Sequence, residues 1–237
     1  MKKVAIIIAG GSGQRMGQEI PKQFLNVGEK PIIIYTLERF QKHPHIDGII
    51  VVCIDGWHDM LKAYARQFGI SKLVSVVSGG SCGQESIKKG LDEAKKIYDE
   101  NDMVLIHDAI RPMVSEDVIS DNIAICETLG NATVVAPVTT VVLSKTDETY
   151  STEVVDRDSL LLTQTPQAFI LKDILSAHEE AKKKGITNSV ASCALYAELG
   201  RKVYFSNGDE TNIKLTRPGD IKIFKALLSV QDSDWMK

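Results

Sequence analysis

Long apolar runs are missing from this sequence of 237 residues, and none is long enough for a helix that crosses a bilayer. The chain opens directly on a short apolar stretch and has no secretory signal pattern, so we expect a cytoplasmic location. The net charge is only −3, which gives no general attraction to nucleic acid or to an acidic membrane. The composition therefore predicts a globular protein whose partners include neither nucleic acid nor membrane.

Cysteine pairs, internal repeats and linkers are also missing. The four cysteines, Cys53, Cys82, Cys126 and Cys193, lie far apart and form no Cys-x-x-Cys motif. Their spacing argues against a structural zinc site and against a disulfide framework, and it favours free thiols. The length suits one large α/β domain or two small ones. Because no linker divides the chain, we predict a single domain over residues 1–237.

A glycine-rich stretch follows the first apolar run, residues 4–8. Three glycines within residues 10–13 let the backbone turn tightly and bring its N–H groups close to a ligand. Two cations, Arg15 and Lys22, come next. The stretch lacks the Gly-Lys-Ser/Thr end of a P-loop, and Met16 stands where the dinucleotide fingerprint needs its last glycine. We predict a phosphate loop of another kind; a glycine turn with two solvated cations is the alternative.

Apolar strands alternate with amphipathic helices over the first 137 residues. Strands are predicted at residues 4–8, 49–54, 73–77, 103–106 and 133–137, and helices at 31–42, 57–68, 85–99 and 115–129. This alternation predicts an α/β fold with a mostly parallel sheet and helices on both faces. Ligands of such sheets bind beyond the carboxyl ends of the strands. We therefore expect the loops 10–13, 78–81 and 107–111 to meet at one crevice.

The pattern changes after residue 137. Two β-stretches, 138–144 and 152–155, flank a polar tip, so we predict a protruding β-arm at about 138–155 rather than a second domain. Residues 154–162 have no clear helical period, and a rigid turn is predicted at 165–167. Helices are predicted again at 172–184, 190–199 and 220–230, and a strand at 202–205.

Charged side chains gather at two further places. Asp108 and Arg111 follow a strand, where the carboxylate can hold Mg²⁺ or position a nucleophile and the guanidinium can hold phosphate. The alternative is an ion pair that closes the loop, with His107 as a structural histidine. Lys214 and Arg217 precede a helix N-terminus, which suits an anion site as well as a solvated loop.

Together these motifs resemble the 2-C-methyl-D-erythritol 4-phosphate cytidylyltransferase family and the related ribitol-5-phosphate cytidylyltransferases. The matching pieces are residues 9–16, 21–25, 79–80, 86, 107–112, 156–157, 165–167 and 212–218. They keep the family order and cover nearly the whole chain. The resemblance implies a Rossmann-like nucleotidyltransferase fold that binds CTP, a polyol phosphate and Mg²⁺. It also implies a homodimer built through the β-arm.

The resemblance further implies a role for individual residues. Those expected to line the nucleotide are Ala9, Gly10, Gly11, Gly13, Gly79, Gly80 and Ser86. Those expected to stabilise the reacting phosphates are Arg15, Lys22 and Lys214. Those expected around the acceptor are Asp108, Ala109, Arg111, Thr187 and, from the other subunit, Arg157; Asp108 is also the expected metal ligand.

Two positions depart from the family pattern. Gly83 stands where an arginine is usual, and Asn188 and Ser189 follow Thr187 where acidic residues are usual. The first expectation for function is transfer of CMP from CTP to 2-C-methyl-D-erythritol 4-phosphate, which releases pyrophosphate and serves isoprenoid precursor synthesis. The second expectation is that the acceptor is ribitol 5-phosphate or another polyol phosphate, for the synthesis of cell-surface polymers. A non-catalytic nucleotide-binding protein is the third, and the retained cations argue against it.

Overall fold

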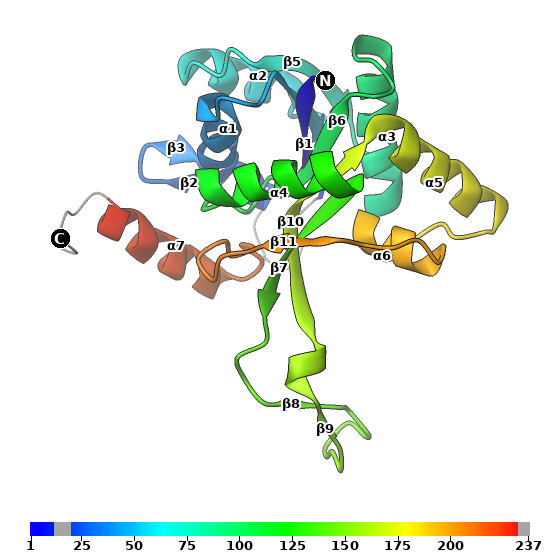
Figure 1. Cartoon of the computed structure of the whole chain (residues 1–237). Coiled ribbons are helices and arrows are strands. Elements are labelled where there is room, and N and C mark those ends of the chain that lie inside the picture. The colour runs from blue at the N-terminus through cyan, green and yellow to red at the C-terminus, as the bar shows by residue number, and fades with distance from the viewer. Residues whose placement is uncertain (12–19, 232–237) are drawn as a thin grey trace.

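A computed structural model describes residues 1–11 and 20–231, and its centre is a seven-stranded sheet (Figure 1). The strand order is β11-β7-β10-β6-β1-β4-β5. The strands are β1 (Lys3–Ala9), β4 (Gly48–Cys53), β5 (Leu73–Ser78), β6 (Met103–Asp108), β7 (Asn131–Pro137), β10 (Leu161–Ile170) and β11 (Phe205–Asn207). The helices are α1 (Ile32–Lys42), α2 (His58–Gln67), α3 (Gly83–Ile97), α4 (Glu116–Leu129), α5 (Leu171–Lys183), α6 (Ser192–Glu198) and α7 (Pro218–Gln231).

Strand β1 lies at the heart of the sheet, parallel to β4 on one side and to β6 on the other. Its side chains alternate between two hydrophobic cores. Ala5 and Ile7 pack in the core that α1, α2 and α4 cover, and Val4 and Ile6 pack in the core that α3, α5 and α6 cover. A strand buried on both faces needs apolar residues at every position, which explains its uninterrupted apolar sequence. The predicted mostly parallel sheet with helices on both faces is confirmed.

The helices begin and end close to where the sequence predicts. Helix α4 illustrates the local causes: the Ser115 hydroxyl caps it by accepting from the Val118 N–H at 3.2 Å. Gly130 ends it with a φ of 87°, a conformation that favours glycine. Within the part of the chain that the structure describes, no helix has the length and apolarity to cross a membrane.

Strand β10 was not predicted from the sequence. Residues 165–167 were expected to form a rigid turn, but they lie inside this ten-residue strand, which runs antiparallel between β6 and β7. The register with β7 shifts between Thr163 and Gln167, and the Thr165–Pro166 peptide bond is cis. Proline cannot donate to a strand ladder and normally marks a sheet edge or a bulge, so the sequence around Pro166 concealed the strand.

Beyond β7 the chain leaves the body of the molecule as an arm and returns through β10 (Figure 1). Two short strands pair antiparallel in the arm, β8 (Val142–Leu143) and β9 (Val154–Val155), followed by the 3₁₀ turn η3 (Arg157–Ser159). The arm exposes apolar side chains, among them Val141, Leu143 and Val154. A two-stranded ribbon is marginal in water, so such an arm is stabilised when another surface covers it.

Two smaller pieces complete the fold near the glycine loop. They are the hairpin of β2 (Asn26–Val27) and β3 (Lys30–Pro31) and the 3₁₀ turn η2 (Lys22–Phe24). A third core joins this hairpin to α7, with Val27 and Ile32 against Leu215 and Phe224.

Candidate active site

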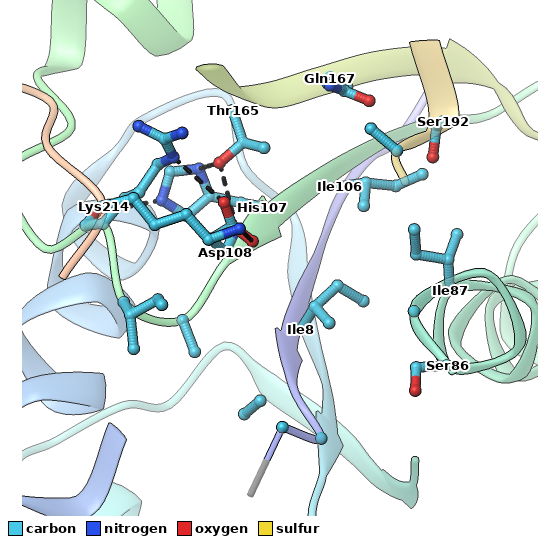
Figure 2. Close-up of a pocket in the computed structure, with 18 of the residues that line it drawn as sticks. Ile8, Ser86, Ile87, Ile106, His107, Asp108, Thr165, Gln167, Ser192 and Lys214 are labelled. Carbon is cyan, nitrogen blue, oxygen red and sulfur yellow. Dashed lines mark hydrogen bonds and ion pairs between the residues drawn. The ribbon is translucent and has the colours of Figure 1, made fainter. Parts of the chain in front are cut away.

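The carboxyl ends of β1 and β6 open into a cavity of about 680 Å³, which the residues after β5 also reach. Strand β10 and the segment before α6 complete its walls. Figure 2 shows Asp108, Thr165 and Lys214 on one side of this cavity and Ser86 on α3 on the opposite side, with Ile8 between them. The predicted convergence of three strand-end loops is therefore confirmed for the described parts of those loops.

A buried glutamine, Gln23, anchors the beginning of the glycine loop. Gln23 Nε2 donates to the Ala9 carbonyl at 2.7 Å and to the Gly11 carbonyl at 3.0 Å. A side chain on Gly79 would place its Cβ 3.2 Å from the Gly10 Cα, so the loops after β1 and β5 touch backbone to backbone. Lys22, beside Gln23 in η2, lines the same cavity.

The first turn of α3 forms the opposite wall. The Ser86 hydroxyl accepts from the Gly80 N–H at 2.9 Å and donates to the Cys82 carbonyl at 2.9 Å. Glu85 accepts from the Ser81 hydroxyl at 2.6 Å and from the Ser81 N–H at 2.7 Å, and these two hydrogen bonds lower the pKa of its carboxyl. These contacts fix the loop after β5 in a shape that leaves Gly80 and Ser86 on the cavity.

Two cations and one carboxylate meet at the end of β6. Asp108 Oδ1 lies 3.0 Å from Lys214 Nζ, and Asp108 Oδ2 lies 3.1 Å from Arg111 Nε. Burial favours the neutral carboxyl, but the charges of Lys214 and Arg111 outweigh it and lower the pKa of Asp108. Arg111 also donates to the Asn212 carbonyl at 2.7 Å. This end of the cavity therefore carries a net positive charge and suits a phosphate.

A chain of hydrogen bonds fixes this loop. The Asp108 N–H donates to Thr165 Oγ1 at 3.1 Å, and Thr165 Oγ1 lies 3.0 Å from His107 Nδ1. His107 Nε2 lies 3.2 Å from the Arg111 carbonyl, which can only accept, so Nε2 carries the proton. Burial lowers the pKa of His107 to about 4. The imidazole is therefore neutral near pH 7 and orients the loop, as a structural histidine does.

The described residues that line this cavity do not by themselves form a group of metal ligands. Asp108 is the one carboxylate among the described residues that line the cavity, and two cations already neutralise it. No group of three His, Cys, Asp or Glu side chains with metal-binding geometry occurs in residues 1–11 and 20–231. Mg²⁺ prefers several oxygen ligands and often takes them from substrate phosphates and water. The predicted role of Asp108 as metal ligand stays a prediction.

Most of the predicted site residues lie on the cavity. They are Ala9, Gly10, Gly11, Lys22, Gly80, Ser86, Asp108, Ala109, Arg111 and Lys214. Gly79 does not line the cavity itself but contacts Gly10, which does. Gly13 and Arg15 lie outside the described residues.

Two predicted residues do not line the cavity. Thr187 is exposed, its carbonyl accepts from Cys82 Sγ at 3.5 Å, and its side chain does not line the cavity; its contact with the acceptor stays a prediction. The chain turns into the cavity only three residues later, at Val190, Ala191 and Ser192. Arg157 lies on the arm, where it donates to the Thr139 carbonyl at 3.1 Å. Arg157 does not line the cavity of its own chain, and a role in a second subunit stays a prediction.

The sequence did not point to Gln167 or Ser192 as cavity residues. Gln167 is buried in β10, and its Oε1 accepts from the Cys193 N–H at 3.0 Å. Ser192 is 2% exposed, and its hydroxyl has no hydrogen-bond partner in the structure. Figure 2 shows both side chains at the same end of the cavity. Gln167 belongs to the motif at 165–167, which has no mechanism that spacing alone reveals, and no sequence motif marks Ser192.

Comparison with known proteins identifies the protein family that this chain matches. The model of the family described as IspD, 2-C-methyl-D-erythritol 4-phosphate cytidylyltransferase, matches residues 3–230. A ribitol-5-phosphate cytidylyltransferase of Lacticaseibacillus paracasei is 44% identical, over 94% of this chain and 97% of the relative. One of Vibrio parahaemolyticus is 41% identical, over 97% of each. A 2-C-methyl-D-erythritol 4-phosphate cytidylyltransferase of Clostridium botulinum is 35% identical, over 96% of this chain and 97% of the relative.

Solved structures show the same fold. The 4-diphosphocytidyl-2C-methyl-D-erythritol synthase of Anaerococcus prevotii superposes with a TM-score of 0.80 at 27% identity, over 96% of each chain. The 2-C-methyl-D-erythritol 4-phosphate cytidylyltransferase of Thermus thermophilus superposes with a TM-score of 0.77 at 26% identity, over 94% of this chain and 98% of the other.

Proposed function

The chain belongs to the 2-C-methyl-D-erythritol 4-phosphate cytidylyltransferase family, and on that premise we propose that it transfers CMP from CTP to ribitol 5-phosphate. The chain is a CTP-dependent nucleotidyltransferase of the polyol-phosphate type, as its relatives are. The relatives that share 38–44% identity with it act, by name, on ribitol 5-phosphate. This reverses the order of the two acceptors that the sequence analysis favoured.

One observation carries the proposal: a glycine loop and two separate cationic groups face the same cavity. Lys22 lies beside the glycine loop, and Lys214 with Arg111 lies at the end of β6. The reaction brings a phosphate monoester against a triphosphate, so two polyanions must approach each other. Fixed cations offset that repulsion and stabilise the charge that develops at the α-phosphorus.

The bond changes need no protein nucleophile. An oxygen of the polyol phosphate attacks the α-phosphorus of CTP and forms the new P–O bond, while the bond from the α-phosphorus to the bridging oxygen breaks. Pyrophosphate leaves with that oxygen, and the product is a CDP-polyol. The second pKa of a phosphate monoester is about 6, so at pH 7 its attacking oxygen is already unprotonated. This chemistry agrees with a cavity in which His107 is neutral and fully hydrogen-bonded.

In this proposal Mg²⁺ would bind together with CTP. The triphosphate of CTP supplies most of the oxygen ligands that the described residues lack. When bound, the cation would neutralise charge on the triphosphate. Lys22 and, outside the described residues, Arg15 would hold that end of the substrate.

The β-arm and Arg157 belong to a homodimer in this proposal. The exposed apolar side chains of the arm support it, because a second subunit would cover them. Arg157 would then reach the neighbour's acceptor phosphate. A cytoplasmic location is also part of the proposal, and the four free cysteines are compatible with a reducing compartment.

The test is a pyrophosphate-release assay with each of CTP, ATP, GTP and UTP against a panel of polyol phosphates. We expect turnover with CTP and ribitol 5-phosphate, weaker turnover with 2-C-methyl-D-erythritol 4-phosphate, and little with purine nucleotides. CTP binding without turnover on any acceptor would favour a non-catalytic nucleotide-binding protein. Equal turnover with ATP or GTP would overturn the assignment of CTP.

A further inference from the structure

One glutamine joins the segment after α5 to the first turn of α3. Gln84, in the first turn of α3, donates from Nε2 to the Ile186 carbonyl at 2.9 Å. Its Oε1 accepts from the Ser189 N–H at 2.7 Å. Both hydrogen bonds join parts of the chain that lie more than a hundred residues apart. The segment that leaves α5 is therefore fastened to the helix that carries Ser86.

That segment leads directly into the wall formed by Val190, Ala191 and Ser192, which we call the acceptor wall. Beyond the wall, the Cys193 N–H donates to Gln167 Oε1. Gln84 therefore holds the chain before the wall and Gln167 holds it after the wall, while the Ser189 hydroxyl also donates to Glu198 Oε2 at 2.8 Å. Ser192 brings to the cavity a buried hydroxyl that has no partner in the protein, the kind of group that a substrate hydroxyl satisfies.

The nucleotide side does not depend on Gln84 in the same way. Ser86 holds Gly80 and the Cys82 carbonyl, and Glu85 holds Ser81. These contacts lie within residues 79–86 and stay in place when the glutamine amide is lost. The acceptor wall, in contrast, loses both bonds that fasten residues 186 and 189 to α3.

We propose that Gln84 is a positioning residue for the acceptor, which holds the acceptor wall so that the Ser192 hydroxyl meets a hydroxyl of the polyol. This inference rests on the proposed polyol-phosphate substrate. A polyol phosphate is gripped at one end by cations, so its chain of hydroxyls needs a second, uncharged set of contacts. Val190, Ala191 and Ser192 provide an uncharged wall with one hydroxyl, that of Ser192, which is buried and has no partner in the structure.

The test is the variant Gln84→Met, which keeps a similar side-chain volume and removes both hydrogen bonds. Its matched control is Gln41→Met. Gln41 is also half-buried and bridges two groups, Ser71 Oγ at 3.0 Å and the Lys72 N–H at 2.8 Å, just before β5 at the far edge of the sheet. Steady-state kinetics with CTP and ribitol 5-phosphate are measured for both variants, together with CTP affinity by calorimetry and thermal unfolding.

We expect Gln84→Met to raise KM for ribitol 5-phosphate about tenfold, since two hydrogen bonds of ordinary strength no longer hold the wall. The KM and affinity for CTP should stay within about twofold, and Gln41→Met should leave both KM values unchanged. Gln84→Leu, which also removes both hydrogen bonds, should give the same change in KM as Gln84→Met and covers the case of a poorly folded methionine variant.

Equal KM values for the two methionine variants, or a loss of CTP affinity in Gln84→Met as large as its change in acceptor KM, would overturn the positioning role while leaving the proposed function intact. Absence of turnover by the wild-type protein with every polyol phosphate would instead overturn the proposed function, and this inference with it.

Discussion

Lys214 Nζ lies 3.0 Å from Asp108 Oδ1, although the two residues are 106 positions apart in the sequence. The pair joins the loop after β6 to the segment before α7, and Arg111 completes it from the other side of the carboxylate. Asp108 thus holds both cations in place at the end of the cavity. This arrangement supports the view that the acceptor phosphate binds there, because its charge would be met by a preformed pair of cations.

Replacement of this lysine should impair catalysis far more than folding. Lys214→Ala leaves Asp108 paired with Arg111 alone and removes one of the two cations. We expect kcat/KM to fall about 10²–10³-fold, the usual result of losing one charge-stabilising group in such a site. The unfolding midpoint should change little, since the Lys214 side chain is 42% exposed. A folded Lys214→Ala protein with wild-type kcat/KM would remove Lys214 from the mechanism.

Lys22 should act on the triphosphate rather than on the acceptor. In Lys22→Ala we expect kcat to fall about 10²–10³-fold, while the glycine loop keeps its anchor because Gln23 still holds Ala9 and Gly11. We expect the same loss of kcat for Arg15→Ala. This expectation comes from the sequence alone, since Arg15 lies outside the described residues. The measurement is kcat at saturating substrates, with circular dichroism as the control for folding. Near-normal kcat would contradict the assignment.

Two of the three buried histidines, His107 and His178, predict a loss of stability at mildly acidic pH. Burial lowers the pKa of His107 and of His178 to about 4, whereas each takes up its proton near 6.5 in the unfolded chain. Between pH 6.5 and pH 4 the unfolded chain binds more protons than the folded chain. The contribution of these histidines to the free energy of unfolding is therefore greatest above pH 6.5, and it is lost as the pH drops toward 4.

His178 lies away from the cavity and allows a clean test. From pH 7 to pH 5, each histidine should cost about 2 kcal/mol of unfolding free energy. His178→Leu should therefore flatten the stability curve by about that amount over this interval, as measured by urea denaturation at each pH. Curves for wild type and variant that run parallel would show that His178 does not titrate in this way.

The proposed dimer predicts that two inactive variants complement each other. Arg157→Ala should raise KM for the polyol phosphate and leave CTP affinity nearly intact, because a guanidinium holds phosphate bidentately. Mixed Arg157→Ala and Lys22→Ala subunits should regain part of the activity, since a heterodimer rebuilds one complete site. Sedimentation that shows a fully active monomer at assay concentration would contradict the shared site.

Local sequence patterns were sufficient to predict the body of the fold. The apolar run of β1 and the Ser115 and Gly130 signals around α4 are properties of short stretches, so they could be recognised without the structure. Strand β10 could not, because Pro166 breaks the usual strand pattern and exposed leucines stand at its start. Its place in the sheet depends on pairing with β6 and β7, and no short stretch records such pairing.

The site was predictable to the extent that its residues lie in strand-end motifs. Gly10 and Asp108 belong to such motifs and do line the cavity, as does Lys22 in the turn η2 that follows the first of them. Thr187 lies off the cavity and residues 190–192 line it, because a loop sequence does not reveal at which residue the chain turns inward. The bonds of Gln84 to residues 186 and 189 bridge distant segments, and only the folded chain brings them together.

The most direct test of the central claim is a competition between acceptors. The protein receives limiting CTP with equal concentrations of ribitol 5-phosphate and 2-C-methyl-D-erythritol 4-phosphate, and mass spectrometry measures the two CDP-polyols. Their initial ratio equals the ratio of the two kcat/KM values, whatever the absolute rates. We expect CDP-ribitol to exceed the other product by at least about tenfold, a difference of about 1.4 kcal/mol in transition-state binding. A mixture dominated by the methylerythritol product, or the absence of any CDP-polyol, would contradict the account.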